Sequence, residues 1–327
     1  MIVSMKPPYD ITQKILHLTS SISIKLGRID ASHLSRQSPR LRKENRIKTI
    51  HSSLKIEGNS LEEEQVSAIL DHQKIIGPKK DITEVLNAIK AYDHLNRFHA
   101  FSEKSFLKAH GMMMKGLSDE AGSYRSGTVG IVKGSKIMHV APPAGNARNL
   151  MRDLFSYLKN DDDLLLIKSC VFHYELEYIH PFSNGNGRMG RLWQSIILRR
   201  EYPVFEFLSF EKLIAYNQAE YYKTLSQCDI KGKSTDFIEY LLGILDRSLE
   251  ELLQYNNRPM KTEDRLDYFV SLGLHQFTRL DYMNVFKDLS SATASRDLAK
   301  GIELKIFSKS GEKNKTKYTL INRHNQL

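Results

Sequence analysis

Hydrophobic residues recur at helical spacing along most of this chain, and no other feature restricts its possible folds as strongly. From residue 10 to about residue 255, apolar side chains follow one another at intervals of three and four. One face of a first helix is indicated by Ile11, Ile15, Leu16 and Leu18. Strand-like alternation before residue 260 is confined to residues 128–140, where glycines interrupt β-branched residues. The pattern predicts a mainly α-helical bundle with one small β-hairpin.

Composition excludes several classes of protein. The 327 residues are 41% hydrophobic and 26% charged, which excludes both a disordered chain and one embedded in a membrane. The longest apolar runs, such as residues 164–167, fall far short of the roughly 20 residues that span a bilayer. Polar residues interrupt the first twenty positions, so no signal peptide is predicted and we expect a cytoplasmic protein. The two cysteines, Cys170 and Cys228, form no CxxC pair and offer neither a disulfide framework nor a zinc ribbon.

A second unit is predicted beyond the helical bundle. Turn residues at 256–259 interrupt the helical pattern, and we expect a linker over residues 254–262. Residues 263–327 then show the order of three helices followed by a two-stranded wing, which is typical of a winged helix-turn-helix. Its third helix, over residues 292–300, would be the recognition helix.

Capping residues set the expected ends of this third helix. Ser290 and Ser291 offer an N-cap, and Gly301 offers the C-cap that ends many helices. The two strands of the wing are expected at residues 304–307 and 317–321, joined by a basic segment.

The charge of the chain indicates an acidic partner. The formal net charge is +10, and the region from residue 281 onward contains nine basic residues against five acidic ones. DNA bound by the winged helix is one such partner, although winged helices also bind proteins. Six basic residues within residues 36–48 form a second basic stretch, for which we favour a solvated helix face over a nucleic-acid contact.

The most informative segment is YIHPFSNGNGRMGRLW, residues 178–193. Pro181 restricts the residue before it, so a helix ending at Ile179 would be followed by His180 in extended geometry. A loop would then present the imidazole, which could take a proton from an attacking hydroxyl.

Glycines and arginines follow the histidine. Gly185 and Gly187 allow the backbone to approach a ligand closely, and the next helix should begin near Asn186. A helix N-terminus flanked by Arg188 and Arg191 would bind phosphate groups. These residues suffice for nucleotidyl or phosphoryl transfer.

Three other motifs fit the same region less well. Gly185, Gly187 and Gly190 satisfy GxGxxG, but the preceding segment has a helical period and no parallel-strand pattern follows. No Lys-Ser or Lys-Thr pair closes a Walker A loop. His173 and Glu175 match the HxE of zinc deaminases, but PCxxC is absent, so we interpret His173 as a core or supporting residue.

Residues 180–191, HPFSNGNGRMGR, resemble the Fic signature HPFx(D/E)GNGRxxR. Members of that family mostly transfer AMP from ATP to a protein hydroxyl. The resemblance implies a Fic-type helical bundle with a β-hairpin flap as the fold of the helical part. It further implies ATP as substrate, Mg²⁺ as cofactor, and a target protein with a Ser, Thr or Tyr hydroxyl, which could be the chain itself. One position departs from the signature, because Asn184 stands where the family usually has Asp or Glu.

By this resemblance, His180 is the general base. The nucleotide would be bound by Asn184, Gly185, Asn186, Gly187, Arg188, Gly190 and Arg191, with Arg188 on the phosphates and Arg191 near the γ-phosphate. Phe182 would pack beneath the loop. Tyr221 and Tyr222 lie where the family packs aromatic rings near the adenine, although helix packing explains this pair equally well. Magnesium favours charged oxygen ligands, so Asn184 predicts weaker binding of the metal than an aspartate would give.

The predicted hairpin resembles the family's flap, which would place a target backbone alongside Val132, Lys133 and Gly134 by strand addition.

Residues 51–64, HSSLKIEGNSLEEE, form the second segment of interest. Ser53 and Glu57 are four residues apart and share one helix face, and Ser60 with Glu63 fits a capping box for the next helix. By itself this pattern indicates an ordinary helix corner. Beside the Fic signature, it resembles the family's inhibitory motif (S/T)xxxE(G/N), which implies that Glu57 pairs with Arg191 and repels ATP.

Together these patterns predict four regions: an N-terminal helical region with the inhibitory motif at 1–95, a Fic core at 96–253, the linker and the winged helix. Two further readings stay open, namely removal of AMP by the same site and a DNA-associated regulator whose Fic core senses nucleotides. Some Fic-like enzymes transfer phosphate, UMP or phosphocholine, but their signatures usually depart further from GNGRxxR. A homodimer is compatible with the sequence.

Overall fold

The computed structural model of the protein describes residues 6–31, 39–128, 130–133, 136–206, 208–257, 261–286, 289–312 and 316–321. Helices dominate these residues, which confirms the mainly α fold expected from the periodicity. The chain divides into two compact units, one of residues 1–35 and 45–253 and the other of residues 36–44 and 254–327. Within the described ranges, no helix combines the length and the apolar character that crossing a membrane requires.

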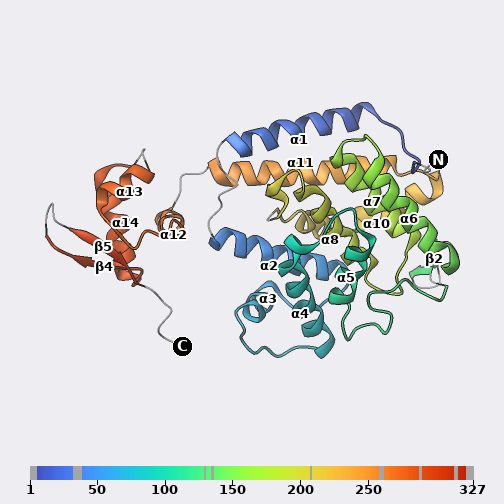
Figure 1. Ribbon diagram of the computed structural model, residues 1–327, viewed down its shortest axis with the longest axis horizontal. Helices are drawn as coiled ribbons and strands as arrows, with labels where there is room; N and C mark the ends of the chain where they lie inside the picture. Colours follow the sequence, from blue (N-terminus) through green and yellow to red (C-terminus); the bar gives the residue numbers. More distant parts are fainter. Residues whose placement is uncertain are drawn as a thin grey trace. The chain divides into compact units, whose positions relative to one another are not determined.

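The larger unit contains most of the helices and the hairpin (Figure 1). Its α-helices, of which α2 and α11 each extend by a few residues into the other unit, are α1 (Gln13–Ala31), α2 (Pro39–Ile56), α3 (Glu63–Leu70), α4 (Lys79–Asp93), α5 (Glu103–Met113), α6 (Ala144–Asn160), α7 (Leu165–Ile179), α8 (Asn186–Arg199), α9 (Glu211–Tyr216), α10 (Gln218–Lys231) and α11 (Thr235–Asn257). Two 3₁₀ helices, η1 (Leu95–Arg97) and η2 (Pro203–Glu206), and the antiparallel strands β1 (Gly130–Lys133) and β2 (Lys136–Val140) complete it.

Helices α7 and α8 form the centre of this unit. Almost every residue of both helices is buried, as expected for helices surrounded by other helices. Trp193 of α8 packs edge-on against Phe106 and Phe155, and its indole N–H donates to the carbonyl oxygen of Ala100 at 3.0 Å. The turn between α7 and α8 is therefore held by the core on both sides.

Helix α1 runs alongside α11 (Figure 1), where Lys25 binds Asp246 at 2.8 Å. Its buried face consists of Ile15, Ile22, Leu26 and Ile29. Ile11 and Leu16 are about half exposed, so their predicted place on the buried face was wrong. The buried residues Ile15, Ile22 and Ile29 are seven residues apart and therefore lie on one face of the helix. Leu16 is one position further on and points away from that face.

The corner after α2 differs from the expected capping box. Glu62, and not Ser60, is the N-cap of α3, and its backbone N–H donates to the Gln65 side chain at 3.0 Å. Ser60 instead donates to the carboxylate of Asp81 on α4. The corner is thereby fixed to α4, and the prediction for Ser60 and Glu63 was wrong.

The second unit contains α12 (Thr262–Ser271), β3 (Gln276–Phe277), α13 (Arg279–Val285), α14 (Ser291–Glu303), β4 (Phe307–Ser310) and β5 (Lys317–Leu320). Its antiparallel sheet has the order β3–β5–β4. A small aromatic core, including Phe269, Phe277, Tyr282 and Phe307, holds the helices on the sheet.

The third helix of this unit begins as expected and ends later. Ser290 is its N-cap and accepts from the Thr293 N–H at 3.1 Å, which confirms the predicted cap. Gly301 was wrongly expected to end the helix: α14 continues to Glu303, and the ring of Phe307 packs where a side chain at 301 would lie. The following strand consequently begins at Phe307, later than expected.

Candidate active site

Helix α7 ends at Ile179, and His180 caps it. The His180 N–H donates to the carbonyl oxygen of Leu176 at 3.0 Å. Its backbone is left-handed (φ 48°, ψ 56°), so the expectation of an extended histidine was wrong. A left-handed residue closes the helix and turns the chain before Pro181. The half-buried ring has Nδ1 3.3 Å from the carbonyl oxygen of Glu177, and a proton on Nδ1 leaves Nε2 as the basic nitrogen.

Buried side chains hold the loop after His180 through hydrogen bonds to its backbone. The Asn186 side chain accepts from the Phe182 N–H at 3.0 Å and donates to the Phe182 carbonyl oxygen at 2.9 Å. His110 stacks on the Phe182 ring with 3.5 Å between centroids, and its Nε2 lies 3.0 Å from the carbonyl oxygen of Asn184. Burial lowers the pKa of His110 to about 4, so the ring is neutral at pH 7. Because Nδ1 accepts from the Gly122 N–H, Nε2 carries the proton and donates to the loop.

Helix α8 begins directly in this loop. Gly185 is its N-cap with φ 89°, and no side chain of the described residues caps the first turn. The amides of Asn186, Gly187 and Arg188 therefore form a helix N-terminus of the kind that binds anions.

Arg191 is fully buried and binds the end of α2. Its Nη2 donates to Glu57 Oε1 at 2.7 Å and to the Ser53 carbonyl oxygen at 2.9 Å, and its Nε donates to Ser53 Oγ at 3.0 Å. Burial lowers the pKa of Arg191, but the negative charges around it, chiefly Glu57, outweigh burial and raise the pKa overall. Ser53 and Glu57, which share a helix face, thus lie together with Arg191.

Gly187 makes this close approach possible. A side chain at this position would collide with Glu57 Oε1 and would lie 3.0 Å from Arg191 Nη1 and 3.2 Å from Glu177 Oε1. Two carboxylates and one guanidinium therefore converge on the bare backbone of the first turn of α8.

Arg188, on the same turn, is 2% exposed. Its Nη1 donates to Glu84 Oε1 at 3.2 Å, and its Nη2 donates to Asn184 Oδ1 at 2.9 Å. Glu84 comes from α4 and also accepts from Asn59 Nδ2 at 2.8 Å. Both Arg188 and Arg191 of α8 are thus bound by carboxylates from the N-terminal helices.

The two adjacent tyrosines of α10 lie in different environments, one buried and one exposed. Tyr221 is buried, donates to Glu177 Oε1 at 3.2 Å, and lies 3.1 Å from His173 Nε2. Tyr222 is 41% exposed, and its hydroxyl lies 3.5 Å from the Ile56 carbonyl oxygen, beside the end of α2. His173 is a core residue whose ring packs against Gly190. Burial lowers its pKa to about 3.

The hairpin is tied to the histidine turn through one buried arginine. Arg125 Nε donates to the His180 carbonyl oxygen at 2.8 Å, and its Nη atoms donate to the carbonyl oxygens of Gly127 and Pro142, which flank the hairpin. Val132 and Lys133 lie in β1, where only the backbone is described, and Gly134 lies outside the described residues.

Three supporting residues escaped the sequence analysis: Glu84, His110 and Arg125. A signal existed for Glu84, which lies four residues before Ala88 and therefore on the apolar face of α4. An acid on an apolar face indicates a buried partner. His110 and Arg125 carried no comparable signal.

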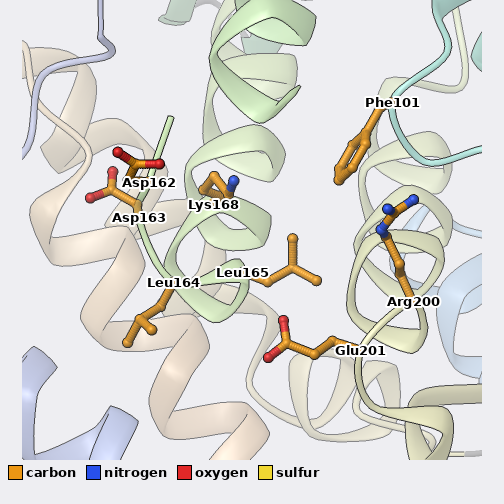
Figure 2. Close-up of a pocket in the computed structure, with 8 residues that line it drawn as sticks. All are labelled: Phe101, Asp162, Asp163, Leu164, Leu165, Lys168, Arg200 and Glu201. Carbon is orange, nitrogen blue, oxygen red and sulfur yellow. The ribbon is translucent and has the colours of Figure 1, made fainter. Parts of the chain in front are cut away.

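A separate pocket of about 390 Å³ lies at the far ends of α7 and α8 (Figure 2). Lys168 and two aspartates line one side of it, and Phe101 with Arg200 lines the other (Figure 2). The length of α7 places it about 20 Å from His180. The signature residues do not reach this pocket.

Known proteins resemble the chain in sequence and in structure. A sequence profile of the Fic/DOC family matches residues 100–198. The Aedes aegypti "Protein adenylyltransferase Fic" is 27% identical over 223 residues, covering 64% of this chain and 42% of that protein. The Caenorhabditis briggsae "Protein adenylyltransferase fic-1" is 25% identical over 262 residues, covering 76% and 46%. The chain thus spans less than half the length of these curated relatives.

A crystal structure of a Fic family protein from Desulfovibrio desulfuricans G20 matches almost the whole chain. It superposes with a TM-score of 0.74 at 36% identity, covering 98% of this chain and 100% of that one. Because this agreement extends over the full length of a Fic family protein, the chain belongs to the Fic family.

Proposed function

We propose that the protein is an adenylyltransferase that moves AMP from ATP to a hydroxyl group of a protein, and that Glu57 inhibits it. The observation that carries this proposal is the convergence on one turn of His180, an uncapped helix N-terminus, and the buried Arg188 and Arg191. Curated relatives named protein adenylyltransferase support the same chemistry.

The proposed reaction places each group in one role. His180 Nε2 takes the proton from a Ser, Thr or Tyr hydroxyl, and the oxygen attacks the α-phosphorus of ATP. The bond between the α-phosphorus and its bridging oxygen breaks, and pyrophosphate leaves with the amides of α8 and the arginines stabilising its charge. The β1–β2 hairpin would hold the target segment by strand addition.

Magnesium would be held mainly by the nucleotide. Among the described residues, no three His, Cys, Asp or Glu side chains gather as a metal site. The loop offers one neutral oxygen, Asn184 Oδ1, which now accepts from Arg188. Such a donor suits a cation that arrives with ATP and keeps most of its ligands from phosphate and water.

Inhibition follows from the pairing of Arg191. A carboxylate bound to Arg191 takes the place of a phosphate group, and its negative charge opposes the entry of a triphosphate. The Glu57 side chain is 25% exposed, so it can leave without unfolding the core.

The chemistry is tested by mass spectrometry of the Glu57→Gly protein after incubation with ATP and magnesium. We expect AMP on a hydroxyl side chain, and no adduct when His180→Ala is added to the same protein. Retention of the adduct by the double variant would contradict the role of His180. Absence of any adduct despite ATP binding would contradict the proposed activity.

We further propose that the second unit is a winged helix that binds an acidic partner such as DNA. Its support is the order of elements from α12 to β5 and the exposed Arg296, Lys309 and Lys317. Binding to duplex DNA should weaken steeply between low and high salt. Absence of binding at low salt would favour a protein partner.

A further inference from the structure

Arg188 depends on a carboxylate that its own loop does not provide. A buried guanidinium requires an acceptor of opposite charge, because desolvation of an unpaired charge is costly. Asn184 gives an oxygen without a charge. Of the described carboxylates, Glu84 is the one bonded to Arg188, and it is itself 5% exposed.

The bonding pattern divides the guanidinium into an occupied and an available side. Glu84 holds Nη1 at 3.2 Å. Nη2 donates to the neutral Asn184 oxygen, and Nε is buried without a hydrogen-bond partner among the described residues. Nε and Nη2 form one two-donor edge of the guanidinium, a geometry that matches two phosphate oxygens. A phosphate on this edge would replace the neutral side-chain amide of Asn184 and would accept a hydrogen bond from Nε.

We propose that Glu84 is the positioning residue for Arg188: it fixes Nη1 so that the Nε–Nη2 edge is presented to the nucleotide phosphates. Asn184 Oδ1 accepts from Nη2 on that edge, and its lack of charge would let a phosphate displace it readily. The inference rests on the proposed function only in assigning Arg188 to the phosphates.

The Glu84 carboxylate also connects Arg188 to the corner after α2, residues 57–62, which contains the proposed inhibitory Glu57. Glu84 Oε2 accepts from Asn59, two residues after Glu57, and the Asn59 side chain also accepts from the Leu61 N–H at 3.1 Å. The corner and the phosphate edge therefore share one anchor on α4.

The test measures ATP affinity and AMP transfer in the Glu57→Gly background. Glu84→Gln should raise the Kd for ATP about tenfold, the lower end of the effect that removal of a group orienting a metal-ligating side chain has on metal affinity. The rate of AMP transfer at saturating ATP should fall by a smaller factor than the affinity, because bound ATP itself still draws Arg188 to the phosphates. Glu84→Asp keeps the negative charge but moves the carboxylate away from Arg188 by the length of one methylene. This variant should also raise the Kd for ATP.

Asp81→Asn is the matched control, because Asp81 lies on the same helix and holds Ser60 of the same corner without contacting Arg188. This control should leave the Kd unchanged. An unchanged or lower Kd in both Glu84 variants would overturn the proposal, as would a loss of transfer rate at unchanged Kd. If Glu84→Gln does not fold, Glu84→Asp decides. If Glu57→Gly binds ATP but transfers no AMP, the proposed function fails, and the Kd comparison still decides the role of Glu84.

Discussion

At the scale of single residues, the site is a set of charges that are paired within the protein. Arg191 has no exposed surface, and its Nη2 and Nε are bound by Ser53 and Glu57. Its Nη1 is buried without a hydrogen-bond partner among the described residues, next to Gly187. An unsatisfied donor beside a helix N-terminus is well placed for an anionic ligand.

Asn184 stands where the Fic signature has an acid, and this difference should affect the magnesium dependence of AMP transfer. In the Glu57→Gly background, Asn184→Asp should lower the magnesium concentration for half-maximal AMP transfer several-fold, because a carboxylate is a stronger ligand for Mg²⁺ than an amide. Ser183→Asp, which adds the same charge one residue earlier on an exposed side chain, serves as control. Equal magnesium dependence with and without the Asn184→Asp substitution would exclude a metal ligand at this position.

Glu211 on α9 should make stability depend on pH. This side chain is fully buried, and burial raises its pKa to about 8. The unfolded chain loses this proton near its ordinary pKa of about 4.5, whereas the folded chain keeps it up to pH 8, so folding stability falls as pH rises between these values. Glu211→Gln should therefore raise the melting temperature more at pH 8 than at pH 5. An equal effect at both values would contradict the raised pKa.

At the scale of elements, the central feature is the α7–α8 turn. Its left-handed His180, the braced loop and the uncapped start of α8 are all fixed by buried contacts, so the site is preorganised. Arg125 joins this turn to both ends of the hairpin segment. A rigid turn can hold the proposed base and the proposed anion site in a fixed relative position.

In the second unit, the stability of α14 should depend on the buried carboxylate of Asp297. Asp297 has no exposed surface and accepts from Arg265 Nε at 2.6 Å and from Thr262 and Tyr282. Burial alone would raise the pKa of Asp297, but the hydrogen bonds, first that from Arg265, lower it overall. Its contribution is therefore present at neutral pH and is lost as pH falls through the lowered pKa.

Asp297→Ala should destabilise this unit by about 3 kcal/mol, because it removes the buried carboxylate that binds Arg265 and accepts from Thr262 and Tyr282. Thermal or urea unfolding of the full chain at pH 7 measures the change. Glu303→Gln removes an exposed ion pair of the same helix and should cost at most about 0.5 kcal/mol. Similar losses in the two variants would contradict the importance of the buried network.

Sequence alone predicted the parts of the site that are contiguous or locally patterned. In the site, the helix ending at Ile179 and the start of α8 follow from local rules, as does the helix cap at Ser290 in the second unit. Local pattern marks Glu84 as an acid on an apolar face, but it cannot say what His110, Arg125 and Glu84 contact, because they meet the loop across 74, 55 and 104 residues. Local rules also failed at Gly301, where tertiary packing of Phe307 decides the role of the glycine.

At the scale of the whole molecule, the chain combines a Fic-type helical unit with a second unit of its own core. The corner after α2, the start of α8 and His180 all belong to the larger unit, so the proposed control of the reaction needs no contribution from the second.

The central claim is that Glu57 holds the enzyme inactive by occupying Arg191. The most direct measurement is the rate of label transfer from α-labelled ATP, with magnesium, by the wild type and by Glu57→Gly. We predict a rate at least about tenfold higher for Glu57→Gly, since a charge pair at a buried arginine should be worth more than about 1.4 kcal/mol. Equal labelling by the two proteins would contradict the claim.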